Sequence, residues 1–212
     1  MDDAMDDVDA KNRKKIVVAM CGASGAVYGI RLIRALMAMP VEISLVISVA
    51  GRAILAHEAG FAHKTMADFL KDHPMTCHPG AHLVELDPDD GFASIASGSF
   101  RHQGMVIAPC SMNTLAAAAA GITDNLIHRA ADVCLKEGRP LILVPRETPL
   151  SVIHLQNMLR LARAGAVILP PSPGFYMRPL TIEDLVDGVV ARILDRLGFH
   201  HDIAPRWSGP EA

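Results

Sequence analysis

The chain has 212 residues, half of them apolar and 20% charged, and its formal net charge at pH 7 is −3. This composition excludes a disordered chain, and the length suits one domain with a sizeable core. The acidic balance and the 4% of aromatic residues argue against a nucleic-acid-binding protein, which would present a basic face and rings that stack on bases.

The first fifteen residues are charged, with five aspartates followed by four basic residues. They lack the apolar region of a secretory signal, so residues 1–15 are predicted to be a solvated tail and residues 16–212 a single domain. The four cysteines, at 21, 77, 110 and 134, form no C-x-x-C pair. This pattern indicates reduced thiols in a cytoplasmic protein.

The domain opens on an apolar run, residues 16–21, that leads into Gly22-Ala23-Ser24-Gly25 and then into an apolar-periodic segment. The pattern predicts a buried strand, a tight loop and the start of a helix. A helix N-terminus carries partial positive charge, so we expect an anion such as a phosphate there. The spacing G-x-S-G-x-x-x-G is neither a dinucleotide loop nor a P-loop, and a plain tight turn is the alternative.

Further β-rich or apolar runs at 41–48, 83–86, 105–108, 141–144 and 166–169 predict five more strands. Helices are expected to begin near Arg52 and Met112, at a cap on Thr123 or Asp124, at Pro149, and at Thr181. The uncharged stretch 103–123 is interrupted by Pro109 and polar residues, so it predicts a strand and an Ala-rich helix, not a membrane span. This alternation predicts a doubly wound α/β fold with a parallel sheet.

Ligands of such sheets bind at the carboxyl ends of the strands, which here lead into loops 22–25, 48–52, 109–114, 145–149 and 170–178. Loop 109–114 brings Ser111, Asn113 and Thr114 to a helix start, whereas ordinary capping needs only one such side chain. Loop 145–149 holds Arg146 and Glu147, for which a surface ion pair is the alternative. The irregular spacing of the His and Cys residues between 73 and 82 matches no standard zinc site, so we predict no metal.

Taken together, seven segments resemble the flavin prenyltransferase (UbiX) family, also long labelled aromatic-acid decarboxylase. The resemblance covers roughly residues 16 to 207. The matching segments are GASGAVYG at 22–29, SGSF at 97–100, APCSMNTLA at 108–116, RAADVCLKE at 129–137, PRETPL at 145–150, GAVILPPSPGFYMRP at 165–179 and DLVDGVVARILDRLG at 184–198.

This resemblance implies a flavodoxin-like (Rossmann-like) three-layer α/β protein that binds FMN and needs no metal. It implies transfer of the dimethylallyl group of dimethylallyl phosphate to N5 and C6 of reduced FMN, which closes a fourth ring. The product, prenylated FMN, would serve a UbiD-type decarboxylase. The resemblance also implies a homododecamer or another large homo-oligomer, with the site assembled between subunits.

Site residues are carried over from the matching motifs as expectations. The implied catalytic residues are Ser24, Glu147 and Glu58, of which Ser24 and Glu147 would transfer a proton and Glu58 would lie near the prenyl phosphate. The implied donor-binding residues are Tyr176 and Arg192, with Arg129 and Lys136 nearby, and Trp207 is expected to cover the site or to contact another subunit. The implied FMN contacts are Gly22, Ala23, Ser24, Ser48, Ser111, Met112, Asn113, Thr114 and Arg146.

These residue types suit the implied chemistry. A phosphate that leaves without Mg²⁺ needs cations and hydroxyl donors, which arginine, lysine and tyrosine side chains supply. A nucleophilic flavin nitrogen needs a proton acceptor, and Glu147 with the Ser24 hydroxyl can relay that proton.

Two other functions remain open at this point. An FMN-dependent cysteine decarboxylase would have the same fold, but Tyr176 and Arg192 favour the prenyltransferase. A non-enzymatic FMN carrier would bind the flavin without consuming a prenyl phosphate.

Overall fold

The computed structural model describes residues 13–73, 75–207 and 209. In this part of the chain, six parallel strands form one sheet in the order β3-β2-β1-β4-β5-β6. The order reverses between β1 and β4, which in doubly wound folds opens a crevice at the carboxyl ends of the strands. The strands are β1 (Lys14–Met20), β2 (Val41–Ile47), β3 (His82–Leu86), β4 (Met105–Cys110), β5 (Leu141–Pro145) and β6 (Val167–Ile168).

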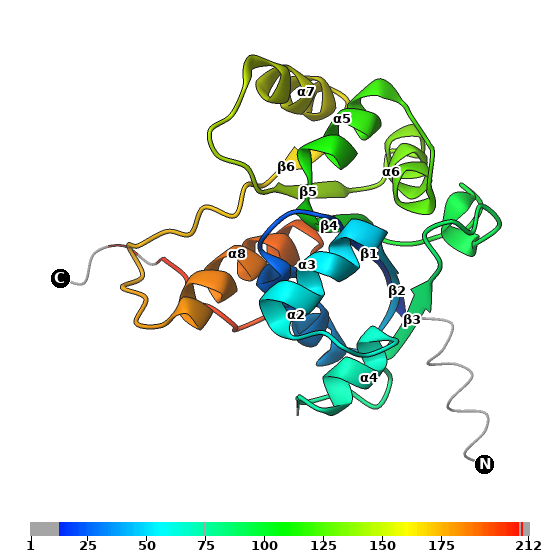
Figure 1. Ribbon diagram of the computed structural model, residues 1–212. Helices are drawn as coiled ribbons and strands as arrows, with labels where there is room; N and C mark the ends of the chain where they lie inside the picture. The colour runs from blue at the N-terminus through cyan, green and yellow to red at the C-terminus, as the bar shows by residue number, and fades with distance from the viewer. Residues whose placement is uncertain (1–12, 74, 208, 210–212) are drawn as a thin grey trace, which may run out of the picture.

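Helices cover both faces of the sheet, which gives three layers (Figure 1). One face packs against α2 (Ala26–Met37), α3 (Val49–Ala59), α8 (Ile182–Arg196) and the short α4 (Met66–Lys71). The other face packs against α5 (Met112–Ala120), α6 (Leu126–Lys136), α7 (Val152–Arg163) and the 3₁₀ turn η1 (Ser94–Ala96). The predicted flavodoxin-like doubly wound fold is therefore confirmed.

The apolar runs of the sequence become strands because a parallel sheet covered on both faces has no polar side. Every residue of β4 and β5 is buried, as are the last five residues of β1. The edge strand β3 has no fully buried residue, because only one neighbour and thinner helix cover protect it. Strand burial therefore decreases from the middle of the sheet to this edge.

Some predicted boundaries are wrong. Asn125, rather than Thr123 or Asp124, caps α6, because its Oδ1 accepts the N–H of His128 three residues later at 3.0 Å. The helix predicted from Pro149 begins at Val152, because the hydroxyl of Ser151 caps it. By contrast, the helix start predicted at Thr181 is confirmed, and Thr181 forms a capping box there with Asp184.

The sequence interpretation contained neither α4 nor η1, which follow irregular stretches. It also placed residues 14 and 15 in the N-terminal tail, whereas both belong to β1, where they pair with Val41 and Glu42. Residues 1–12 of the predicted tail lie outside the described residues. No helix in the described ranges is both long and apolar enough to cross a membrane.

Candidate functional site

Three helices begin where neighbouring strands end, at the carboxyl edge of the sheet. Strand β1 leads into α2, β2 into α3, and β4 into α5. The Ser48 hydroxyl caps α3 by accepting the N–H of Gly51 at 3.0 Å, and the Ser111 hydroxyl caps α5 by accepting the N–H of Thr114 at 3.2 Å. Each cap contributes about 1 kcal/mol to helix stability. The two predicted serines thus lie at helix N-termini that follow β2 and β4, the two strands on either side of β1.

Glycines bring the β1–α2 loop against the start of α3. A Cβ on Gly22 would overlap the Cβ of Ala50, and a Cβ on Gly51 would lie 2.5 Å from the carbonyl oxygen of Met20. Only glycine allows both backbones to approach this closely. This proximity makes the loop and the α3 N-terminus one continuous surface that a ligand can contact.

The N-terminus of α2 is occupied by a carboxylate of the chain itself. Oε2 of Glu58 accepts the N–H groups of Gly25 and Ala26, both at 2.9 Å. The prediction that this terminus receives a ligand's phosphate is therefore wrong for these two N–H groups. The attraction between a helix N-terminus and an anion is the one we expected, but Glu58, at the end of α3, supplies the anion.

Glu58 also draws Ser24 and Arg146 into the same cluster. Burial alone would raise the pKa of Glu58, but hydrogen bonds from the Ser24 hydroxyl and the two N–H groups, with the nearby charge of Arg146, hold it below its ordinary value. Arg146 donates from Nε to the Ser24 carbonyl at 3.3 Å. We call Ser24, Glu58 and Arg146 the loop cluster.

Glu147 does not pair with Arg146 within the described residues. Its Oε1 accepts the N–H of Thr148 at 3.0 Å, and its side chain is exposed. The surface ion pair considered for this loop is therefore not seen, and the carboxylate is available to another group.

The start of α5 is suited to an anion. The hydroxyl of Ser111 also donates to the Thr114 hydroxyl at 3.1 Å, so these side chains cap each other and the helix. Among the described residues, the N–H groups of Met112 and Asn113 have no acceptor. Two such N–H groups and a helix dipole fit the phosphate of a flavin mononucleotide.

The buried thiols beside this helix are not reactive groups. Burial raises the pKa of Cys21 to about 11, despite a hydrogen bond to Thr114, and raises that of Cys110 well above its ordinary value, with the neighbouring Cys21 adding to the shift. A position just before a helix start favours a lowered thiol pKa. At Cys110 desolvation outweighs that effect, so this residue is a packed thiol of the core.

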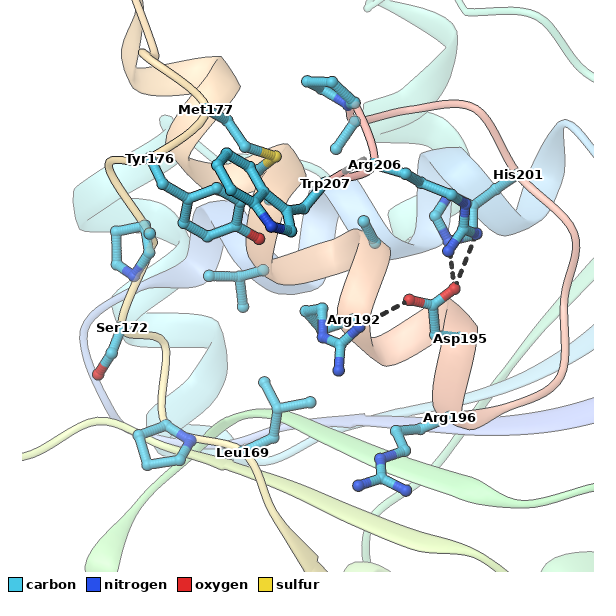
Figure 2. Close-up of a pocket in the computed structure, with 18 of the residues that line it drawn as sticks. Leu169, Ser172, Tyr176, Met177, Arg192, Asp195, Arg196, His201, Arg206 and Trp207 are labelled. Atoms are coloured by element: carbon cyan, nitrogen blue, oxygen red, sulfur yellow. Dashed lines mark hydrogen bonds and ion pairs between the residues drawn. The ribbon is translucent and has the colours of Figure 1, made fainter. Parts of the chain in front are cut away.

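A cavity of about 660 Å³ lies between the loop after β6, helix α8 and the C-terminal segment (Figure 2). Tyr176, Arg192 and Trp207 all line it. The ring of Tyr176 meets the ring of Trp207 edge-on, with 5.6 Å between centroids. The resemblance implied that Tyr176 and Arg192 bind the donor and that Trp207 covers the site or contacts another subunit, and all three residues line this cavity.

Arg192 forms an ion pair and also lines the cavity. Its Nη1 donates to Oδ2 of Asp195, three residues further along the same helix, at 3.2 Å. The same guanidinium lines the cavity. The ion pair therefore does not exclude a binding role.

Arg129 and Lys136 lie elsewhere in the chain. Arg129 donates to the carbonyl of Ala96 and to Asp132, both at 3.0 Å, and Lys136 pairs with Glu137 at 2.6 Å. Both belong to α6, which covers the opposite face of the sheet from α8 (Figure 1). One chain does not bring these two cations to Tyr176 and Arg192.

Sequence reasoning missed several residues of the cavity with ionisable side chains, among them Asp195, His201 and Arg206. Asp195 follows Arg192 by three positions, which is the spacing of an ion pair along a helix. The signal that could have found the others is the run of charged and aromatic residues after the last helix, 200–207, which has no role in the sheet.

The chain matches the flavoprotein family over residues 6–194. It is 49% identical over 199 residues to the flavin prenyltransferase UbiX of Pseudomonas aeruginosa, covering 92% of this chain and 94% of that protein. The crystal structure of AnUbiX (PadA1) with FMN and dimethylallyl pyrophosphate superposes with a TM-score of 0.83 at 44% identity, covering 94% of this chain and all of the other. The dodecameric FMN-dependent UbiX-like decarboxylase of Escherichia coli O157:H7 gives a TM-score of 0.81 at 47% identity, covering 92% and 100%.

The fold and the family match are those of a flavoprotein. Within that class, the chain belongs to the flavin prenyltransferase (UbiX) family. The FMN-dependent cysteine decarboxylase TvaF is only 15% identical with a TM-score of 0.58, so that likeness shows the fold alone.

Proposed function

We propose that this chain is a flavin prenyltransferase that joins the dimethylallyl group of dimethylallyl phosphate to N5 and C6 of reduced FMN. The observation that carries the proposal is the cavity in which Tyr176, Arg192 and Trp207 meet beside the carboxyl end of β6. A hydroxyl, a guanidinium and an aromatic ring in one cavity match a donor with a phosphate at one end and an apolar allyl group at the other.

The flavin binds at the helix N-termini of the carboxyl edge. The N–H groups of Met112 and Asn113, with the Ser111 and Thr114 hydroxyls, hold its phosphate. Ser48 and the glycine-containing loop at Gly22 and Ala23 provide the surface for the rest of the molecule, and Arg146 adds a cation. When bound, reduced FMN supplies the N5 and C6 atoms that the dimethylallyl group joins.

The donor phosphate is held by Arg192 and the Tyr176 hydroxyl. In the described residues the hydroxyl of Tyr176 has no partner, and its side chain is exposed toward the cavity region. As the bond between the allyl carbon and the phosphate oxygen breaks, positive charge develops on the allyl group. The Trp207 face and the Tyr176 ring stabilise that charge, while Arg192 stabilises the leaving phosphate.

Proton transfer is assigned to Glu147 and Ser24. Glu147 has an exposed carboxylate with one hydrogen bond, to its neighbour Thr148, so it can accept a proton. The Ser24 hydroxyl, which is bonded to Glu58, can pass a proton between the flavin and a carboxylate. Glu58 itself stays ionised, because it is held by two N–H groups, and it fixes the position of Ser24.

Arg129 and Lys136 reach the donor from a second copy of the chain. Their place on the far side of the sheet in one chain supports this assignment, as does the dodecameric form of the Escherichia coli relative. Helix α7 has an exposed apolar face that a second copy could cover, formed by Val152, Ile153, Leu155 and Leu159.

The product, prenylated FMN, passes to a UbiD-type decarboxylase in the cytoplasm. The location is supported by the cysteines, since Cys21, Cys77, Cys110 and Cys134 are all unpaired.

The test is an anaerobic incubation of the protein with reduced FMN and dimethylallyl phosphate, followed by mass analysis of the extracted flavin. A flavin heavier by one C5H8 unit supports the proposal. Unmodified FMN, with no turnover of the pyrophosphate either, would favour a carrier, and conversion of a cysteine-containing substrate would favour a cysteine decarboxylase.

A further inference from the structure

Asp195 is the hub of a network that joins α8 to the C-terminal segment, residues 200–207 (Figure 2). Its Oδ2 accepts from Nη1 of Arg192 at 3.2 Å. Its Oδ1 accepts from Nη2 of Arg206 at 2.9 Å and lies 3.1 Å from Nε2 of His201. All four residues line the same cavity as Tyr176 and Trp207.

The network is more than an exposed ion pair. The side chain of His201 is only 2% exposed, and its Nδ1 has no partner within the described residues. Because an ionised carboxylate only accepts hydrogen bonds, Nε2 of His201 carries the proton that faces Asp195. Burial alone would raise the pKa of Asp195, but hydrogen bonds from Arg206 and His201 hold it below its ordinary value. The carboxylate is therefore a stable anchor near neutral pH.

The C-terminal segment depends on side chains for its position. Within the described ranges, residues 200–207 make no backbone–backbone hydrogen bond. They are tied down by the two bonds to Asp195, by Ile203 against the core and by the edge contact of Trp207 with Tyr176. Without Asp195, two of these four attachments are lost.

Arg192 and Arg206 have N–H donors that their bonds to Asp195 do not use. A guanidinium has five N–H donors, and Arg192 and Arg206 each give one to Asp195. Their side chains are 67% and 61% exposed, and both line the cavity, Arg192 from α8 and Arg206 from the C-terminal segment. Two guanidinium groups fixed on one carboxylate leave several N–H donors for a phosphate between them.

We propose that Asp195 is a positioning residue of the donor site, and that Arg206, which it holds beside Arg192, is a second guanidinium for the donor's phosphate. This inference rests on the proposed function and extends it. It makes the C-terminal segment part of the binding site rather than a passive end of the chain.

The experiment compares Asp195→Asn and Arg206→Gln with a matched control, Asp187→Asn. Asp187 lies on the same helix and forms an ion pair with Arg31, which the variant weakens, but it does not line the cavity. Two readouts are taken on the full-length protein. One is the KM for dimethylallyl phosphate, measured with kcat and the Kd for FMN. The other is the fluorescence anisotropy of Trp207, the single tryptophan of the chain, without any ligand.

For Asp195→Asn and Arg206→Gln we expect KM for dimethylallyl phosphate to rise about 10- to 100-fold, because one charge-assisted contact is lost. The kcat should stay within about twofold, and the Kd for FMN should not change. The anisotropy of Trp207 should fall in Asp195→Asn, since the segment loses its anchor. Asp187→Asn should match the wild type in both readouts.

Wild-type KM and anisotropy in Asp195→Asn would overturn the positioning role, as would the same changes in Asp187→Asn. A wild-type KM in Arg206→Gln would contradict the role of Arg206 as a second guanidinium for the donor's phosphate. If Asp195→Asn does not fold, Arg206→Gln alone tests that role. If the wild type forms no prenylated flavin, the proposed function fails separately. Anisotropy then still tests the anchor, and titration with inorganic phosphate, followed through Trp207, tests Arg206.

Discussion

The carboxylate of Glu58 lies 2.9 Å from the backbone nitrogen of Gly25, although 33 positions separate the two residues. Oε2 of Glu58 accepts hydrogen bonds from the N–H groups at the start of α2. The Glu58 carboxylate also accepts a hydrogen bond from the Ser24 hydroxyl in the same loop. This one side chain joins the end of α3 to the first loop of the site.

Replacing Glu58 tests that link. We expect Glu58→Gln to lower the free energy of unfolding at pH 7 by about 0.5–1.5 kcal/mol, with solvent screening keeping the loss small. Because the folded pKa of Glu58 lies below its ordinary value of 4.5, its contribution is fully present above pH 4.5 and is lost as the pH falls through the folded pKa.

Urea denaturation at several pH values measures this difference. The wild type and Glu58→Gln should differ at pH 7 and converge well below pH 4.5. Glu183→Gln is the control, since its carboxylate accepts no hydrogen bond in the described part of the chain. A pH-independent difference would show that the effect is not that of the ionised carboxylate.

Glu147→Gln tests the proton relay. We expect the rate of flavin prenylation to fall about 100-fold or more, because an amide cannot accept the proton. The Kd for FMN should not change, since the only bond of the carboxylate among the described residues is to the N–H of Thr148. Single-turnover kinetics and FMN titration measure the two quantities, and an unchanged rate would remove Glu147 from the mechanism.

Tyr176→Phe separates the hydroxyl from the ring. The ring contact with Trp207 should persist, so stability and the anisotropy of Trp207 should match the wild type. We expect KM for dimethylallyl phosphate to rise about 10-fold, which is the loss of one hydrogen bond to a charged group. In Tyr176→Ala the anisotropy should also fall, and a Phe variant with unchanged KM would show that the hydroxyl does not bind the donor.

The cysteines should react selectively. Burial raises the pKa of Cys21 to about 11 and that of Cys134 to about 12, and raises the pKa of Cys110 well above its ordinary value. At pH 8 these three are neutral thiols without solvent access, whereas Cys77 is exposed. A thiol-specific disulfide reagent should titrate one thiol quickly in the native protein and four in guanidinium chloride; a second fast thiol would contradict this burial.

The apolar face of α7 should hold copies of the chain together. Ile153 is 67% exposed in one chain and Leu155 is 51% exposed, and an apolar face of this kind is typical of subunit contacts. We expect Ile153→Glu to give smaller species in light scattering after size-exclusion chromatography, and Thr76→Glu, on an exposed loop, to leave the assembly unchanged. An unchanged mass for Ile153→Glu would place the contact elsewhere.

Several elements could be predicted because their signals are local. The buried strands at 16–21 and 141–144 are visible as apolar runs, and Ser111 and Thr181 precede periodic segments as N-caps do. The cap of α6 was misplaced because Thr123, Asp124 and Asn125 are all good caps, and only backbone geometry selects Asn125. Helix α4 was missed because six residues give too little periodicity to detect.

By itself, the sequence determined the class of fold, the loops at the carboxyl edge of the sheet and, through its motifs, the family. Only the tertiary structure decided that Glu58 occupies the start of α2, that α6 and α8 lie on opposite faces, and that Asp195 holds Arg206 beside Arg192. The physical reason is that strands, helices and caps depend on neighbours within a few residues. Hydrogen bonds between residues 11 to 33 positions apart depend on how the helices pack on the sheet.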